Sequence, residues 1–226
     1  MHILIAGNGK MAELFETRLP VSGHTVQRFG EGGLVLGDTP QHTVALHVGS
    51  GKNLPSLVEC CIKYRIPILQ GSTGQTSNQE WQVLLVNAEN FALPILRLIR
   101  ILPEFAKMLT PPDYALSVGV TESHQSTKKT LPGTAARMAA AVGLLNSDID
   151  SIREQSVQLA LGVPPSALDG HGYHWITWEG AGVEIQLATK VNGRDAYYGG
   201  GLYLLRLLHE RRSERGVQDV ISFLNW

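Results

Sequence analysis

The amino-acid sequence predicts an α/β protein with an N-terminal Rossmann-like dinucleotide-binding domain and a C-terminal α+β domain that carries an open mixed sheet. Three observations lead to this prediction. In the first half of the chain, short apolar runs alternate with helical patterns, which is typical of a parallel sheet built from βαβ units. In the second half, a helical stretch precedes successive runs rich in β-branched and aromatic residues, which is typical of an α+β lobe.

The third observation is a glycine-rich loop near the N-terminus. An apolar run over residues 2–6 leads into Gly7-Asn8-Gly9-Lys10-Met11-Ala12, and a helical pattern follows. This is the G-x-G-x-x-A form of the dinucleotide fingerprint in its strand–turn–helix context. The first glycine allows the tight turn, the second lets a pyrophosphate approach the backbone, and the small alanine allows close helix–strand packing. We expect residues Gly7, Asn8, Gly9, Lys10 and Met11 to bind a cofactor; the alternative is a glycine turn without a ligand.

The rest of the first lobe follows from the periodicity of its apolar residues. We expect strands over residues 24–29, 44–48 and 66–70, a helix over 54–64, a short helix over 80–86 and a further strand before Asn90. A helix over 96–108 should be broken or kinked near Pro103, because proline removes a helix hydrogen bond. A strand over 114–120 then delivers the chain to Glu122.

In the second lobe, the pattern predicts strands over 152–161, 173–178 and 183–191, with a hairpin turn at residues 179–182. A long helix over 196–211 and a short element over 217–223 return the chain to the first lobe. We therefore expect residues 1–91 and 195–226 to form the dinucleotide-binding domain. Residues 92–194 should form a domain for substrate binding and oligomerisation.

The second strand suggests which dinucleotide is bound. An NAD site usually carries Asp or Glu about 20 residues after the glycines, whereas an NADP site tends to have a nearby Arg. Here the strand ends near Arg28, no acid occurs until Glu31, and Lys10 adds a positive charge to the glycine loop. These residues favour NADPH over NADH, although an arginine at a strand end also occurs for solubility alone.

Composition narrows the function classes. The chain has 226 residues and a net charge of -1, so no bulk electrostatic attraction to nucleic acid is expected. No apolar run reaches the length of a membrane span, and the N-terminus lacks the basic region and cleavage site of a signal peptide. Cys60 and Cys61 are adjacent in a helical stretch, where their side chains point apart, so we expect core or half-buried thiols. Together these features predict a cytoplasmic protein without membrane attachment.

A polar segment in the middle of the chain contains residues suited to acid–base chemistry. Glu122, His124 and Lys128 lie close together, and Leu131-Pro132-Gly133-Thr134 then opens an Ala-rich helical run. The start of a helix leaves about four backbone N–H groups without internal partners and favours an anion. A cation, a proton donor and a helix start suit a small substrate with carboxylates that is protonated during reaction. The alternative is a capped helix after a polar loop.

Taken in order, these motifs resemble the dihydrodipicolinate reductase family (4-hydroxy-tetrahydrodipicolinate reductase), which acts in lysine and diaminopimelate synthesis. The family's patterns are G-x-x-G-R-M-G, one residue shorter here, then G-T-T-G, N-F, E-x-H-H-x-x-K-x-D-A-P-S-G-T-A and R-x-x-F. The matching segments of this chain are Gly7–Ala12, Gly71–Gly74, Asn90-Phe91, Glu122–Ala135 and Arg194–Tyr197. The combined order and spacing are far more specific than any single motif.

The resemblance implies a mechanism in which NADPH or NADH delivers a hydride to a conjugated cyclic imine dicarboxylate. By matched position, His124 would act as the general acid, a role that suits a side chain titrating near physiological pH. Lys128 would hold a substrate carboxylate and stabilise charge on the ring nitrogen. The resemblance also implies substrate contacts by Gln125, Gly133 and Thr134, and cofactor contacts by Gly71, Thr73, Asn90, Phe91 and Arg194. His171 and His174 are also candidates for the substrate lobe, although we expect a structural role for them, and no metal site is predicted.

The chain departs from the family pattern at three places in its signature. Gln125 replaces the second histidine, Thr130 replaces the acid, and one residue is missing between Pro132 and Gly133. These changes leave the exact substrate open. A related reductase of a different imine or 2-oxo acid, or a non-catalytic NADP-binding sensor, remains an alternative.

The C-terminal sheet also departs from the family. Residues 175–191 form a plain hairpin where the family has a longer insert and builds its tetramer from this sheet. We therefore expect a homo-oligomer, either a dimer or a tetramer. The sequence leaves open this choice, the preference between NADPH and NADH, and regulation.

Overall fold

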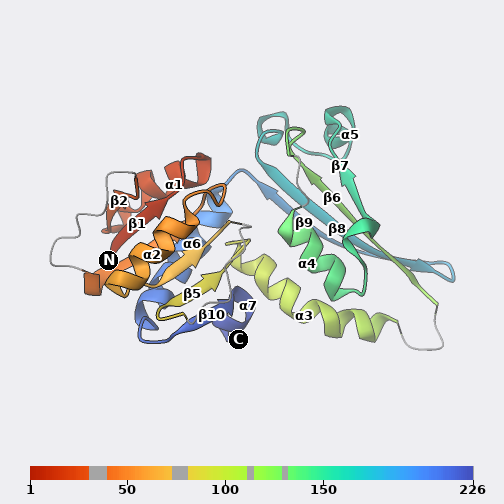
Figure 1. The fold of residues 1–226 in the computed structure, drawn as a ribbon. Helices are drawn as coiled ribbons and strands as arrows, with labels where there is room; N and C mark the ends of the chain where they lie inside the picture. The colour runs from red at the N-terminus through yellow and green to blue at the C-terminus, as the bar shows by residue number, and fades with distance from the viewer. Residues whose placement is uncertain (31–39, 73–80, 111–114, 129–131, 226) are drawn as a thin grey trace. The chain divides into compact units, whose positions relative to one another are not determined.

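The computed structural model describes residues 1–30, 40–72, 81–110, 115–128 and 132–225 of the chain. Contacts divide it into two units, Met1–Ala92 with Tyr197–Trp226, and Leu93–Ala196. The first unit contains both ends of the chain (Figure 1). The assignment of cofactor binding to one unit and substrate binding to the other remains a prediction.

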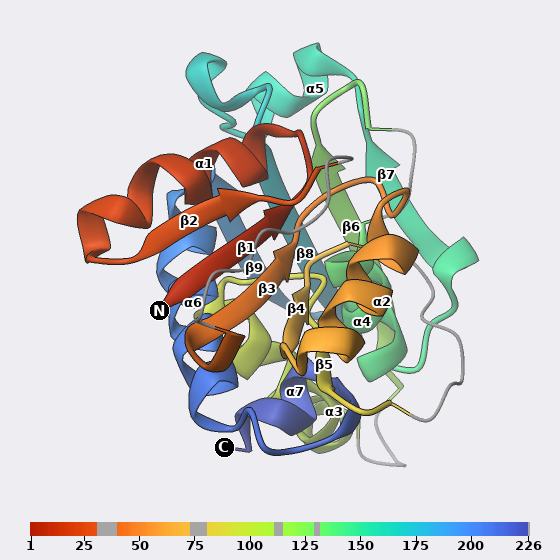
Figure 2. The ribbon, with the colours of Figure 1, turned by 60° about the vertical axis from the view of Figure 1, so that its left-hand side comes forward.

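The first unit is built on a six-stranded sheet in which every pairing is parallel, in the order β10-β5-β4-β3-β1-β2 (Figure 2). The central strands are apolar and buried along almost their whole length, as expected when both faces of a parallel sheet are covered. The strands are β1 (His2–Ala6), β2 (Thr25–Arg28), β3 (Thr43–His47), β4 (Ile68–Gln70), β5 (Leu84–Asn87) and β10 (Gly216–Asp219).

Helices cover both faces of this sheet (Figures 1 and 2). On one face, α2 (Leu54–Tyr64) inserts Leu57, Val58 and Cys61 into a cluster with apolar residues of β1, β3, β4 and β5. The opposite face carries α6 (Asp195–Glu210), which lies beside α1 (Lys10–Arg18), and a short helix α7 (Val220–Leu224) follows β10. Both cysteines are free thiols, with Cys61 buried and Cys60 partly exposed, as the sequence predicted.

The second unit carries a four-stranded mixed sheet in the order β7-β6-β8-β9. The strand β6 (Ser117–His124) pairs in parallel with β7 (Ile149–Ile152) and antiparallel with β8 (His171–Gly180), which forms a hairpin with β9 (Val183–Asn192). This confirms the predicted mixed sheet and the hairpin turn. The helices of this unit are α3 (Leu93–Leu109), α4 (Gly133–Ala141) and α5 (Gln155–Ala160), and α4 contacts α3, β6 and β7.

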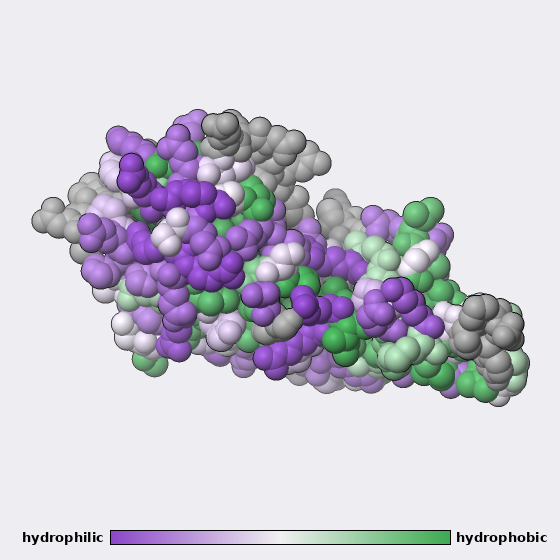
Figure 3. All heavy atoms as spheres, turned by 90° about the horizontal axis from the view of Figure 1, so that it is seen from below, coloured by the Kyte–Doolittle hydropathy of each residue, from purple (hydrophilic) through white to green (hydrophobic). Residues whose placement is uncertain are grey.

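Some apolar side chains remain on the surface. Ile101 and Met108 of α3 are 59% and 73% exposed, and Figure 3 shows apolar surface among the polar side chains on the face turned to the viewer. None of the helices that the structure describes is long and apolar enough to span a membrane.

Two predicted elements are wrong. The strand expected over 152–161 ends at Ile152, and residues 155–160 form α5 instead. The alternating apolar residues Val157, Leu159 and Leu161 suggested a strand, yet all three stay more than a third exposed, while the polar Gln158 between them is fully buried. The helix expected over 80–86 is wrong in its described part, because residues 84–87 form β5. A short continuous apolar run fits either a buried strand or a helix.

Two boundaries also differ from the prediction. The helix α3 runs without a break through Pro103 and begins at Leu93. The strand β6 extends to His124, so Glu122 and His124 belong to the strand itself. Residues two apart on a strand point to the same face, and this places the two side chains next to each other.

Candidate functional site

The glycine loop at the carboxyl end of β1 has the geometry of an anion-binding turn. Gly7 has a φ of 138°, and a Cβ there would lie 2.7 Å from the carbonyl oxygen of Val48, so only glycine fits. Gly9 caps the start of α1. In the part of the chain that the structure describes, no side chain caps that helix, and a Cβ at Gly9 would meet no atom within 4 Å. Ala12 is fully buried, as close helix–strand packing requires. The backbone at the start of α1 is therefore open to an incoming phosphate.

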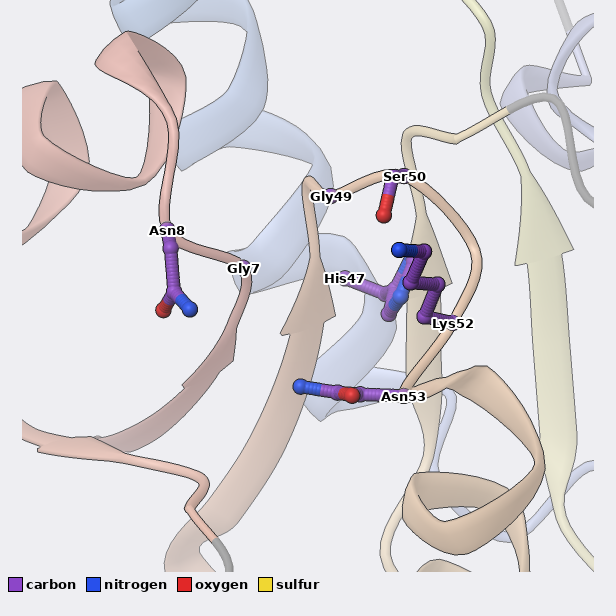
Figure 4. A pocket seen from close by; sticks show the side chains of 7 residues that line it. All are labelled: Gly7, Asn8, His47, Gly49, Ser50, Lys52 and Asn53. Atoms are coloured by element: carbon purple, nitrogen blue, oxygen red, sulfur yellow. The ribbon is translucent and has the colours of Figure 1, made fainter.

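A pocket of about 130 Å³ lies beside this loop, lined by Gly7, Asn8, His47, Gly49, Ser50, Lys52 and Asn53 (Figure 4). It is formed by the segments that follow β1 and β3, which are neighbours in the sheet. The chain goes from β1 to β2 on one side and then returns to β3 on the other, so the strand order reverses here. Open α/β sheets bind ligands at such a switch point.

The loop after β3 was missed in the sequence analysis. His47, Gly49, Ser50, Lys52 and Asn53 contribute most of the pocket lining, although none of them was among the predicted cofactor residues. The signal was present, because the rule that ligands bind at the carboxyl ends of parallel strands applies equally to β3. The side chain of Lys52 brings a cation to the pocket, which suits a phosphate-bearing ligand.

The pocket residue His47, at the end of β3, is hydrogen-bonded to Gly71, the residue that follows β4. His47 is 1% exposed, its Nδ1 has no hydrogen-bond partner among the described residues, and burial lowers its pKa, so the ring is neutral. The backbone N–H of Gly71 donates to the carbonyl oxygen of His47 over 2.7 Å. The predicted cofactor residue Gly71 therefore lies beside the pocket, whereas Thr73 lies outside the described residues.

The structure brings Arg28 to the glycine loop. Its guanidinium donates to the carbonyl oxygen of Gly7 and, over 2.6 Å, to a carboxylate oxygen of Glu16 on α1. The hydrogen bond with Glu16 raises the pKa of Arg28 and lowers that of Glu16. An arginine at the end of β2 thus stands at the place where dinucleotide folds bind the adenosine ribose. Glu31 lies outside the described residues.

Three further predicted cofactor residues have structural partners. The ring of Phe91 is 3% exposed and meets Phe15 edge to face, with ring centroids 5.8 Å apart. Asn90 accepts a hydrogen bond of 2.7 Å from the backbone N–H of Ala92, just before α3. Arg194 lies in the second unit, and its guanidinium is close to Gly170. A Cβ atom placed on that glycine would lie 3.4 Å from the guanidinium. Whether these residues also contact a cofactor remains a prediction.

A second polar cluster lies in the other unit, around Glu122. This carboxylate is fully buried and accepts hydrogen bonds from Nδ1 of His124 (2.7 Å), Oγ of Ser151 (2.5 Å) and the guanidinium of Arg153 (2.5 Å). The parallel register pairs Glu122 with Ser151 directly. Neither Ser151 nor Arg153 was singled out from the sequence, because they follow Glu122 by 29 and 31 positions.

The charges of this cluster are set by burial and by its hydrogen bonds. Burial acts to raise the pKa of Glu122, but the hydrogen bonds from His124, Arg153 and Ser151 outweigh it and lower the pKa to about 2. The carboxylate is therefore ionised at neutral pH. Burial lowers the pKa of Lys128, an effect that Glu122 opposes and Arg153 reinforces. The backbone carbonyl of Lys128 accepts from Arg153 over 3.2 Å, which ties the lysine to the cluster.

Two more histidines border the cluster. His171 bonds to Oγ of Ser123 over 2.8 Å, and His174 bonds to Oγ1 of Thr189 over 3.1 Å. Both are 3% exposed, and burial lowers the pKa of both, to about 3 for His174. Among the residues that the structure describes, no group of His, Cys, Asp and Glu could hold a metal ion.

The predicted substrate residues belong to the same unit. Gln125 directly follows β6 and is partly buried. Gly133 is the first residue of α4, no side chain of the described residues caps this helix, and Thr134 is 6% exposed. The structure thus brings His124 and Lys128 together around Glu122. Residues 129–131, which lead to α4 and include Thr130, lie outside the described residues.

Comparison with known proteins gives a consistent set of relatives. No protein-family model matches the chain. It is 25% identical over 179 residues to a 4-hydroxy-tetrahydrodipicolinate reductase of Xylella fastidiosa, covering 76% of this chain and 69% of that protein. It is 27% identical over 186 residues to the Stenotrophomonas maltophilia protein of the same name, covering 78% and 71%.

Solved structures with a similar fold point the same way. A dipicolinate-bound dihydrodipicolinate reductase from Paenisporosarcina sp. TG-14 aligns with a TM-score of 0.62 at 15% identity, over 97% of each chain. A probable dehydrogenase from Thermotoga maritima aligns with a TM-score of 0.50 at 12% identity, over 94% of this chain and 88% of that one. At these identities the structures establish a shared fold.

Proposed function

Because this chain is an oxidoreductase and a divergent relative of the 4-hydroxy-tetrahydrodipicolinate reductases, we propose that it reduces 4-hydroxy-tetrahydrodipicolinate to tetrahydrodipicolinate in lysine and diaminopimelate biosynthesis. One observation carries the proposal. His124 and Lys128, at the acid and carboxylate-binding positions of the family signature, share a cluster around the buried, ionised Glu122. A proton donor and a cation in one place match a dicarboxylate that is protonated during its reduction.

The first unit would bind the nicotinamide cofactor. When bound, this cofactor supplies the hydride. The start of α1 and the pocket beside Gly7 fit its pyrophosphate and adenosine, because the helix start offers backbone N–H groups and the glycine leaves room for a ligand. We propose NADPH as the preferred form, because Arg28 would give the 2′-phosphate a bidentate cationic partner. NADH remains the alternative.

The second unit would bind and protonate the substrate. His124 would donate a proton to the carbon next to the one that receives the hydride. Lys128 would bind a carboxylate and stabilise negative charge that develops on the ring nitrogen. The backbone N–H groups of Gly133 and Thr134, at the start of α4, would bind the other carboxylate.

The first experiment is an assay of NADPH and NADH oxidation with freshly generated 4-hydroxy-tetrahydrodipicolinate. Turnover that pyridine-2,6-dicarboxylate inhibits competitively is the expected result. NADPH binding without turnover would contradict the proposed substrate. It would favour a related reductase of another imine or 2-oxo acid, or an NADP-binding sensor.

We also propose that the protein is a cytoplasmic homo-oligomer, either a dimer or a tetramer. The exposed apolar side chains of α3 and the outer edge of β9, which pairs with no other strand that the structure describes, would be available to a second copy. Light scattering coupled to size-exclusion chromatography would give the number of subunits, and a monomer at micromolar concentration would contradict this proposal.

A further inference from the structure

The contact between Glu122 and His124 fixes which nitrogen of the ring carries a proton. An ionised carboxylate can only accept hydrogen bonds, so Nδ1 of His124, 2.7 Å away, must be the donor. In the neutral ring, the proton is therefore on Nδ1 and the lone pair is on Nε2. Within the described residues the hydrogen bond of the ring is made by Nδ1, and 16% of the side chain is exposed. Nε2 is thus the nitrogen available to a ligand.

The carboxylate of Glu122 is itself held in place. Its Oε2 faces His124, while its Oε1 accepts from both Ser151 and Arg153. The same guanidinium also donates to the carbonyl oxygens of Ile152 and Lys128, over 2.9 Å and 3.2 Å. A rotation of the carboxylate would break its hydrogen bonds with the hydroxyl of Ser151 and the guanidinium of Arg153. The loss of such bonds in a buried site costs free energy.

The backbone and the ring of His124 are restrained as well. The side-chain amide of Gln158, which is fully buried, donates to the carbonyl oxygen of His124 over 2.7 Å. On the next strand, the ring of His174 meets that of His124 edge to face, with centroids 5.3 Å apart. Neighbours on β7, α5 and β8 therefore all contribute to the orientation of His124, directly or through Glu122.

We propose that Glu122 is the positioning residue for His124: it holds the ring with its proton on Nδ1, directs Nε2 toward the substrate, and stabilises the imidazolium that forms when Nε2 is also protonated. The imidazolium gives the Nε2 proton to the substrate carbon, and the neutral ring with its Nδ1–H bonded to Glu122 remains. This inference rests on the proposed function only in naming the proton acceptor. The tautomer and the orientation follow from the hydrogen bonds of the resting protein.

The charged neighbours are compatible with this role. Arg153 forms an ion pair with Glu122, Lys128 interacts with the same carboxylate electrostatically, and a hydrogen bond joins the two cationic residues. His171 and His174 face it from β8 and are neutral, because burial lowers the pKa of each. The negative charge of Glu122 therefore offsets only part of the positive charge of the cluster when His124 becomes positive, and it acts on the imidazolium directly through the Nδ1 hydrogen bond.

The test is ¹⁵N NMR of the histidine rings together with steady-state kinetics, applied to the wild-type protein and Glu122→Gln. The signals of His124 are assigned as those lost in His124→Gln. Under conditions in which the ring is neutral, we expect the wild type to show the Nδ1–H tautomer alone and Glu122→Gln to show a mixture of tautomers. Positioned proton transfer contributes about 10²–10⁴-fold to rate. We expect kcat to fall within that range while KM for the imine changes little.

Glu179→Gln is the matched control, since Glu179 is an exposed residue of β8 in the same sheet. It should leave the tautomer of His124 and kcat unchanged. NADPH binding and thermal unfolding of each variant report whether it is folded. If Glu122→Gln does not fold, the wild-type spectrum still decides, because a resting Nε2–H tautomer would overturn the proposal.

The outcomes separate this inference from the proposed function. A wild-type protein that shows the Nδ1–H tautomer but does not turn over the imine would refute the substrate and leave the positioning role intact. Turnover of the imine combined with an unchanged tautomer and kcat in Glu122→Gln would refute the positioning role and leave the substrate intact.

Discussion

The imidazole rings of His124 and His174 meet edge to face, with their centroids 5.3 Å apart and their planes at 70°. The antiparallel register places His174 directly opposite Glu122, so the contact is a consequence of strand pairing. Burial, and next the neighbouring His124, lower the pKa of His174 to about 3. His174 is therefore a neutral neighbour of the proposed acid throughout the physiological range.

This pKa predicts how stability depends on pH. The pKa of His174 is about 3 in the folded protein, whereas an unperturbed histidine has a pKa of about 6.5. The unfolded state therefore binds more protons between these limits, and stability falls as the pH falls. From pH 7 to about pH 5 we expect His174 to account for a loss of about 2 kcal/mol in the free energy of unfolding. Urea denaturation should show that loss in the wild type and a smaller one in His174→Gln. Equal losses would contradict the prediction.

Lys128→Ala tests the proposed substrate contact. Removing a charged hydrogen-bonding partner costs about 1.5–3 kcal/mol, so kcat/KM should fall about 10- to 100-fold, with a higher KM and a lower kcat. NADPH affinity should not change, because Lys128 belongs to the other unit. The control is Lys107→Ala, which removes a highly exposed lysine of α3 in the same unit. Loss of NADPH binding in Lys128→Ala would refute its assignment to the substrate.

Substitutions of Arg28 and of Glu16 should change the affinity for NADPH in opposite directions. Arg28→Ala should weaken NADPH binding by about 10-fold or more and leave NADH binding almost unchanged, because one charge-assisted contact to the 2′-phosphate is lost. Glu16→Gln should tighten NADPH binding, because it removes the carboxylate that occupies Arg28. Fluorescence titration with both cofactors measures these affinities, and Lys63→Ala on the exposed side of α2 controls for the loss of a positive charge. Equal weakening of both cofactors in Arg28→Ala would contradict a phosphate contact.

Two glycines of α6 should respond in opposite ways to the same substitution. A Cβ at Gly201 would lie 2.4 Å from the ring of Phe15, whereas a Cβ at Gly199 would meet nothing within 4 Å. Gly201→Ala should destabilise the protein by about 1–3 kcal/mol through overpacking. Gly199→Ala should stabilise it by up to about 1 kcal/mol, because alanine favours the helix. Chemical denaturation of the two variants checks the sign of each change. Equal effects would mean that α6 does not pack on Phe15 as described.

The local elements of the fold could be predicted from the sequence because their signals are local. The run before Gly7, the apolar face of α2 and the turn between β8 and β9 each lie within a dozen residues. Periodicity and turn chemistry act over that distance. The same signals failed for the helix expected over 80–86, because the strand expected before Asn90 already begins at Leu84, and they failed for α5. A continuous apolar run has no period, and the buried residue of α5 is the polar Gln158, whose partners lie in β6 and β7.

By itself, the sequence determined the βαβ order, the glycine loop, and His124 and Lys128 as candidates for acid and cation. The tertiary structure decided what surrounds them. Strand register joined Glu122 to Ser151 and Arg153, and the reversal of strand order placed the loop after β3 beside Gly7. The physical reason is that a buried charge is stable only with hydrogen-bond partners, and nothing in the local sequence specifies which distant residues the fold will supply.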